Sequence, residues 1–185
     1  MRTRWILAAM ILAAPCTWSQ EGAASPEWRL RAYVHRNSLS NAFGVQRAQV
    51  LAAQILSAAG VHLEWDARAP EIEIQLEGPV PGDFRVGSLG YAEPFSRSRV
   101  RIHVLYGRVL AIDSRGGSSA ILAHVLAHEI LHVLEGNAGH SGDGLMKAHW
   151  SKDDLSEMTH RLLPVSDLDR ALIRMHFSKQ YEGTR

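Results

Sequence analysis

Two histidines and a glutamate stand at the spacing of a metal site in the run His128-Glu129-Ile130-Leu131-His132. In a helix, residues four apart share one face, so His128 and His132 could hold the same metal ion. Glu129 would lie about a quarter turn away, where its carboxylate could reach a water on the metal without becoming a ligand. Two imidazole ligands beside a carboxylate base are the arrangement of a zinc hydrolase.

The residues around this run favour a helix. A loop at 116–119 offers a serine as the N-cap, and Gly136 offers a C-terminal stop. His124 lies one turn before His128 and is expected at the helix surface. Burial of two histidines and a glutamate without a partner would be costly, which favours a metal site over a partly exposed helix with satisfied histidines. The apolar residues at helical spacing are Val125, Leu126, Ile130, Val133 and Leu134.

A third ligand is expected just beyond the helix. His140 is the main candidate, because imidazole suits zinc and the glycines at 136 and 139 let the chain turn back. Asp143 is the chief alternative, since a carboxylate can also complete such a site. His149 follows closely and could orient a substrate.

The segment from Ala127 to Met146 resembles the active-site sequence of the metzincin metallopeptidases. Proteins of that family carry a third histidine beyond the glycine that ends the active-site helix, and a methionine turn beneath the metal. The pattern H-E-x-x-H-x-L-x-G-x-x-x-H-S-x-x-G-x-M is most similar to the matrixin branch and to compact secreted bacterial proteins of metzincin type. The resemblance implies that His128, His132 and His140 hold zinc.

This segment departs from the usual family spacing. Glu135 stands where the family has its glycine, and Ala138 stands where it has its third histidine. The loop is therefore two residues longer than usual, and both His140 and Asp143 stay open as the third ligand.

The predicted function is that of a secreted zinc-dependent metalloendopeptidase. Glu129 would act as the general base on a water held by Zn²⁺ and would then pass the proton to the leaving amine. Two alternatives stay open: a zinc hydrolase of a non-peptide substrate, and a non-catalytic metal-binding protein of the same fold. The presence of Glu129 argues against the second, because a scaffold needs no base there.

The amino-terminal 24 residues have the features of a secretory signal. Arg2 and Arg4 precede an apolar run at 5–14, which is too short for a stable membrane span. We expect residues 1–24 to be removed, with the cleavage site between about 19 and 24. Residues 25–185 would then form a single secreted or periplasmic catalytic domain. Cys16, the one cysteine, would leave with the signal, whereas a lipid anchor on it is disfavoured by the preceding proline.

The composition of the chain is that of an ordinary globular protein. It has 185 residues, with 20 lysines and arginines against 19 acidic residues. No basic patch indicates nucleic-acid binding, so the expected partner is a peptide or protein substrate. The oligomeric state is left open.

The predicted fold is α+β and metzincin-like, with a twisted mixed sheet, an active-site helix and C-terminal helices. A helix at 40–59 would follow the first strand, and a short strand at 89–92 is an edge-strand candidate for binding an extended peptide. An ordinary turn is the alternative at 89–92. After Met146, Ser151 is expected to cap a helix that ends at Pro164, and Ser166 a second helix. Alternating apolar residues predict strands within 29–34, 61–65, 71–76 and 100–106.

Overall fold

The computed structural model describes residues 28–79, 87–93, 100–112, 117–136 and 139–182, with only the backbone described from 177 onward. The expected signal at 1–24 lies outside these residues. In chain order the elements are β1 Trp28–His35, α1 Ala42–Ser57, β2 Val61–Trp65, β3 Ile72–Leu76, β4 Gly90–Glu93, β5 Val100–Val104, α2 Tyr106–Ile112, α3 Ser118–Glu135, α4 Lys152–Met158 and α5 Asp167–Glu182. Across the described residues, no helix has the length and apolar composition needed to cross a membrane.

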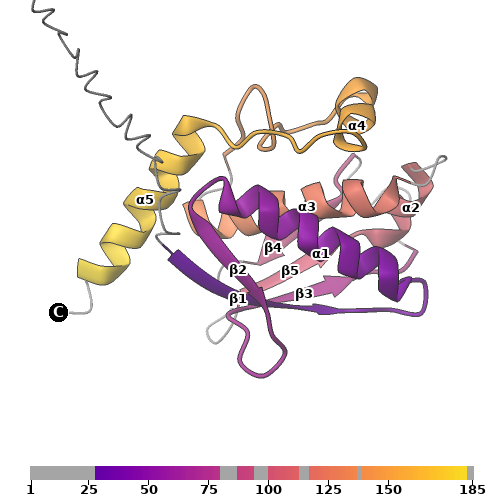
Figure 1. The fold of residues 1–185 in the computed structure, drawn as a ribbon, viewed down its shortest axis with the longest axis horizontal. Helices are drawn as coiled ribbons and strands as arrows, with labels where there is room; N and C mark the ends of the chain where they lie inside the picture. The colour runs from indigo at the N-terminus through magenta and orange to yellow at the C-terminus, as the bar shows by residue number, and fades with distance from the viewer. Residues whose placement is uncertain (1–27, 80–86, 94–99, 113–116, 137–138, 183–185) are drawn as a thin grey trace, which may run out of the picture.

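The strands form one mixed sheet in the order β2-β1-β3-β5-β4 (Figure 1). The pairs β1–β2, β1–β3 and β3–β5 are parallel, whereas β4 pairs antiparallel with β5 at the edge. The short strand expected at 89–92 is therefore present as an edge strand, at Gly90–Glu93.

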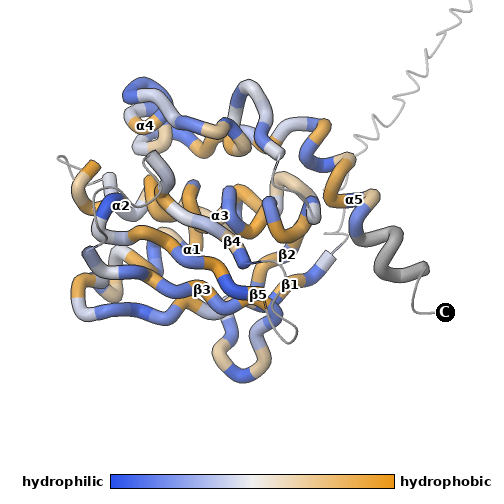
Figure 2. The backbone as a smooth tube through the Cα atoms, turned by 180° about the vertical axis from the view of Figure 1, so that it is seen from behind, coloured by the Kyte–Doolittle hydropathy of each residue, from blue (hydrophilic) through white to orange (hydrophobic). Residues whose placement is uncertain are grey.

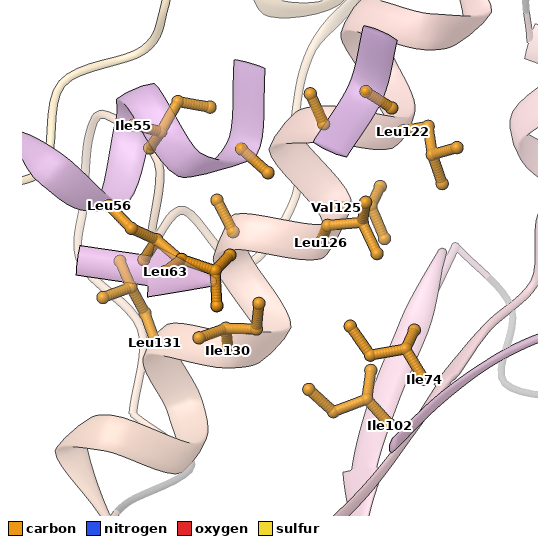
Figure 3. Packing of buried hydrophobic residues seen from close by; sticks show 14 of the residues in the cluster. Ile55, Leu56, Leu63, Ile74, Ile102, Leu122, Val125, Leu126, Ile130 and Leu131 are labelled. Carbon is orange, nitrogen blue, oxygen red and sulfur yellow. The ribbon is translucent and has the colours of Figure 1, made fainter. Parts of the chain in front are cut away.

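Helices α1 and α3 pack against each other above one face of the sheet (Figure 1). Inward side chains of the strands meet the apolar sides of both helices, as Ile74 and Ile102 do below α3 in Figure 3. Figure 2 shows the apolar residues concentrated along α3 and the strands beneath it. Helix α1 turns a stripe of small and aliphatic residues inward, and Ala59 just beyond its end is buried as well: Val45, Ala48, Ala52, Ile55 and Ala59.

The opposite face of the sheet carries polar side chains from the same strands. Arg31 lies 3.8 Å from Glu71, and the His103 ring lies 2.7 Å from the Glu77 carboxylate. Parallel strands usually have both faces covered by helices and are then apolar on both. Because polar residues alternate with apolar residues along these strands, α1 and α3 cover only one face of the sheet.

Several predicted boundaries were wrong. The helix predicted at 40–59 spans Ala42–Ser57, and Asn41 caps it with a side chain that accepts a hydrogen bond from the Phe43 amide at 3.0 Å. The strand predicted to reach Tyr106 ends at Val104, and Tyr106 begins α2, which was not predicted. Residues 100–104 do alternate, but the apolar Leu105 breaks the alternation before Tyr106. A helix as short as α2 gives too few turns for a helical period to show.

The C-terminal helices were predicted with mixed success. Ser151 and Asp154 form the capping box of α4, and the Ser166 hydroxyl accepts the Asp169 amide at 3.1 Å at the start of α5. However, α4 ends at Met158 rather than near Pro164. The chain turns there, and the Leu163 amide bonds to a histidine of α3 instead of continuing a helix.

Candidate metal centre

Helix α3 places the first two histidines of the motif side by side, as their spacing predicted. The Nε2 atoms of His128 and His132 lie 3.0 Å apart, with the rings at 88° and their centroids 4.6 Å apart. Gly136 adopts the left-handed conformation, with φ 66°, and ends the helix as expected. The expected serine cap was wrong, because Gly117 is the N-cap and Ser118 is already helical.

The loop that follows α3 orients the His128 ring through a hydrogen bond. Its Nδ1 donates to the backbone carbonyl of Leu145 at 2.9 Å, so Nε2 faces His132 with its lone pair. Burial, reinforced by the nearby rings of His132 and His140, lowers the pKa of His128 to about 4. The ring is therefore neutral at physiological pH, which is the form that binds metals.

His140 completes a cluster with these two histidines. Its ring centroid lies 4.8 Å from that of His132 and 5.5 Å from that of His128. One ring nitrogen from each of the three histidines lies within 4.8 Å of the others. His140 is exposed, whereas His128 is buried, so the cluster opens to solvent on the His140 side.

Asp143, the alternative ligand, and His149, the candidate for orienting a substrate, are not part of this cluster. Asp143 is exposed, and its backbone carbonyl accepts the Ser141 hydroxyl at 2.8 Å. His149 lies beside Gly87, where a Cβ built on that glycine would be 3.8 Å from the His149 ring. Among the described residues, one group of three or more His, Cys, Asp or Glu side chains lies close enough together to share a metal ion. That group is His128, His132 and His140.

The turn containing Met146 is closed by backbone hydrogen bonds. The Ser141 amide donates to the Met146 carbonyl at 2.8 Å, and the Leu145 amide donates to the Pro164 carbonyl at 2.9 Å. Met146 is almost fully buried. Because the same turn presents the Leu145 carbonyl to His128, it fixes the orientation of a proposed ligand.

The side chain of Glu129 extends from α3 to the edge strand β4. It is 6% exposed, and a Cβ built on Gly90 of β4 would come within 2.7 Å of its Oε1. The carboxylate of the residue that follows His128 therefore lies against the strand expected to bind an extended peptide.

His124 has a role that the sequence did not reveal. It is fully buried rather than on the helix surface. Its Nδ1 donates to the Ala120 carbonyl at 2.7 Å, and its Nε2 accepts the Leu163 amide at 3.0 Å. Burial lowers the pKa of His124, so the ring is neutral and ties α3 to the segment before α5. No local signal indicated this bond, because its partner is 39 residues away.

Glu135 is an unusual residue at the end of α3. It is buried, and its Oε1 has no hydrogen-bond partner among the described residues. Burial, with a further contribution from the Asp169 carboxylate, raises the pKa of Glu135 to about 7. Glu135, Asp169 and His140 line one cavity. The residue that replaces the usual family glycine therefore lies next to the metal centre without being part of the histidine cluster.

The donor set fits zinc. Three imidazole ligands leave one position of a tetrahedral site for water or substrate, which is the composition of a catalytic rather than a structural zinc site. The described residues supply this set without a thiolate, and the bond from His128 to Leu145 is the outer contact that such ligands normally make.

The fold is similar to that of the archaemetzincin from Methanopyrus kandleri. The TM-score is 0.54 over 86% of this chain and 99% of that chain, at 14% sequence identity. No protein-family model matches the chain, and no curated protein matches its sequence. The likeness confirms the predicted metzincin-like α+β fold, and the assignment to the matrixin branch stays a prediction.

Proposed function

We propose that the protein is a zinc-dependent metalloendopeptidase. The observation that carries the proposal is the convergence of His128, His132 and His140 in a metzincin-like fold, with Glu129 next to His128 in the helix and against β4. Zinc would be held by the three histidines, and Glu129 would be the general base.

The chain's own residues have separate tasks in this mechanism. Bound zinc would supply Lewis-acid chemistry, polarising the peptide carbonyl and lowering the pKa of a water. Glu129 accepts the proton of the attacking water and returns it to the leaving amine. The Leu145 carbonyl holds the His128 ring in one orientation throughout.

The position of β4 at the edge of the described sheet supports a peptide substrate. Leu105 donates its amide to the Leu89 carbonyl at 2.8 Å, so Leu89 and Tyr91 face β5 in the ladder. Gly90 and Ala92 then direct their backbone groups away from β5. An extended peptide adding to this edge would form main-chain hydrogen bonds with little demand on its sequence.

We also propose export of the protein. The charged and apolar segments within residues 1–24 support removal of a signal, which would leave a mature chain without cysteine. The intact mass of the exported protein tests this: a mass that includes Met1, or a lipid on Cys16, would contradict it.

Cleavage of casein and of a peptide library, with and without a zinc chelator, tests the proposed activity. We expect cleavage that the chelator abolishes and added zinc restores. Zinc binding without peptide cleavage would favour one of the alternatives, a hydrolase of another substrate or a binding protein. Cleavage that is insensitive to the chelator would contradict the proposal.

A further inference from the structure

Gly90 is the one glycine of β4, and its backbone does not require it. Glycine weakens a strand interior, because it has no side chain to pack and it loses more entropy on folding. Other described glycines have a positive φ, including Gly60 and Gly136, but Gly90 does not. The reason for a glycine here must therefore be space rather than backbone conformation.

The space beside Gly90 is filled by one side chain. A Cβ built on Gly90 would lie 2.7 Å from Oε1, 2.9 Å from Cγ and 3.0 Å from Cδ of Glu129. Real Cβ atoms essentially never show contacts under 3.0 Å, so the strand or the Glu129 side chain would have to shift. Because Glu129 is 6% exposed, a shift of its carboxylate would have to be accommodated by the groups packed around it.

Several hydrogen bonds also hold β4 in place, so the strand cannot easily move away from Glu129. The Ser88 hydroxyl donates to the Gly90 carbonyl at 2.5 Å, and Arg108 of α2 donates to the Ser88 carbonyl at 3.0 Å. The ladder to β5 fixes β4 from the other side. A methyl group added at Gly90 would therefore displace the Glu129 carboxylate.

We propose that Gly90 is a positioning residue: its missing side chain lets the Glu129 carboxylate lie against the edge strand. The contact itself is independent of any activity, whereas its catalytic consequence rests on the proposed function. Gly90 thereby lets the proposed base lie against the strand that would bind the peptide.

A thermal-stability cycle tests the contact without any assay of turnover. Gly90→Ala should lower Tm by about 3–10 °C through overpacking. In a Glu129→Ala background the same change should cost less than about a third of that loss, because the clashing atoms are gone. Gly78→Ala is the matched control, since a Cβ there meets nothing within 4 Å. An equal loss from Gly90→Ala in both backgrounds would overturn the inference.

Kinetics on zinc-loaded protein tests the positioning role. We expect Gly90→Ala to lower kcat by about 10–100-fold, with KM and zinc content within about twofold of the wild type. Gly78→Ala should change neither constant. An unchanged kcat would overturn the role even if the stability cycle shows the contact. If the wild-type protein cleaves no peptide, the proposed function fails separately, and the stability cycle still decides whether Gly90 makes room for Glu129.

Discussion

His140 and Asp143 are the two residues that the sequence left as candidates for the third ligand. The geometry favours His140, whose ring lies 4.8 Å from that of His132, while Asp143 is exposed and outside the cluster. The longer loop does not prevent the convergence, because the left-handed Gly136 redirects the chain at the end of α3.

Zinc retention after dialysis against a competing chelator distinguishes these two residues. His140→Ala should weaken zinc binding by more than about 100-fold, since it removes a ligand rather than an outer partner. Asp143→Ala should bind zinc as the wild type does. Loss of zinc in Asp143→Ala with normal retention in His140→Ala would move the site to the carboxylate.

Glu135 predicts a specific pH dependence of stability. Its pKa is about 7 when folded, against a usual value of 4.5. Between these two values, the folded protein keeps a proton on Glu135 that the unfolded chain releases. The contribution of this protonated Glu135 to the stability of the fold is therefore complete below pH 4.5 and is lost as the pH rises through 7.

Glu135→Gln removes this dependence. In zinc-loaded protein at pH 8, we expect the variant to be more stable than the wild type by about 1–3 kcal/mol, because no buried charge forms. The difference should shrink as the pH falls towards 4.5. Urea unfolding at several pH values measures it, and a difference that is the same at pH 5 and pH 8 would contradict the assignment.

At the scale of elements, α3 was the part of the chain that the sequence predicted best. Its histidine spacing and apolar stripe both have a helical period, and Gly136 marks its end. Local pattern was sufficient because these signals lie within one element. The start of the helix was mispredicted because its N-cap is Gly117. Glycine has no side chain to form the capping hydrogen bond that a serine would have supplied.

The bond between His124 and Leu163 could not be predicted, because it joins α3 to a segment far along the chain. His124→Leu should destabilise the protein by about 1–3 kcal/mol, since it leaves the buried Leu163 amide unpaired. Urea unfolding at pH 8, where the ring is neutral, measures this loss. The exposed His160 provides the control: His160→Leu should change stability by less than about 0.5 kcal/mol. Equal effects of the two changes would show that the bond is not formed.

At the scale of the whole molecule, the one-sided sheet explains where the candidate site lies. Apolar residues on one face of the strands hold α1 and α3, and polar residues on the other face leave that side uncovered by these helices. The sequence showed this alternation along the strands. It could not show the strand order, because β4 comes before β5 in the chain but forms the edge beyond it.

That strand order brings Glu129 and the edge strand together, and the loop after α3 adds His140 to the helical histidines. We propose that this assembly is a zinc centre whose base is Glu129. The most direct test measures zinc content and chelator-sensitive peptide cleavage on the same preparations of wild-type protein and Glu129→Gln.

The substitution keeps the shape of the side chain but removes its ability to accept a proton. We predict equal zinc content in the two proteins and a rate of cleavage about 10²–10⁴-fold lower in Glu129→Gln, the usual loss when a general base is removed. Equal zinc content with an unchanged rate of cleavage would contradict the account.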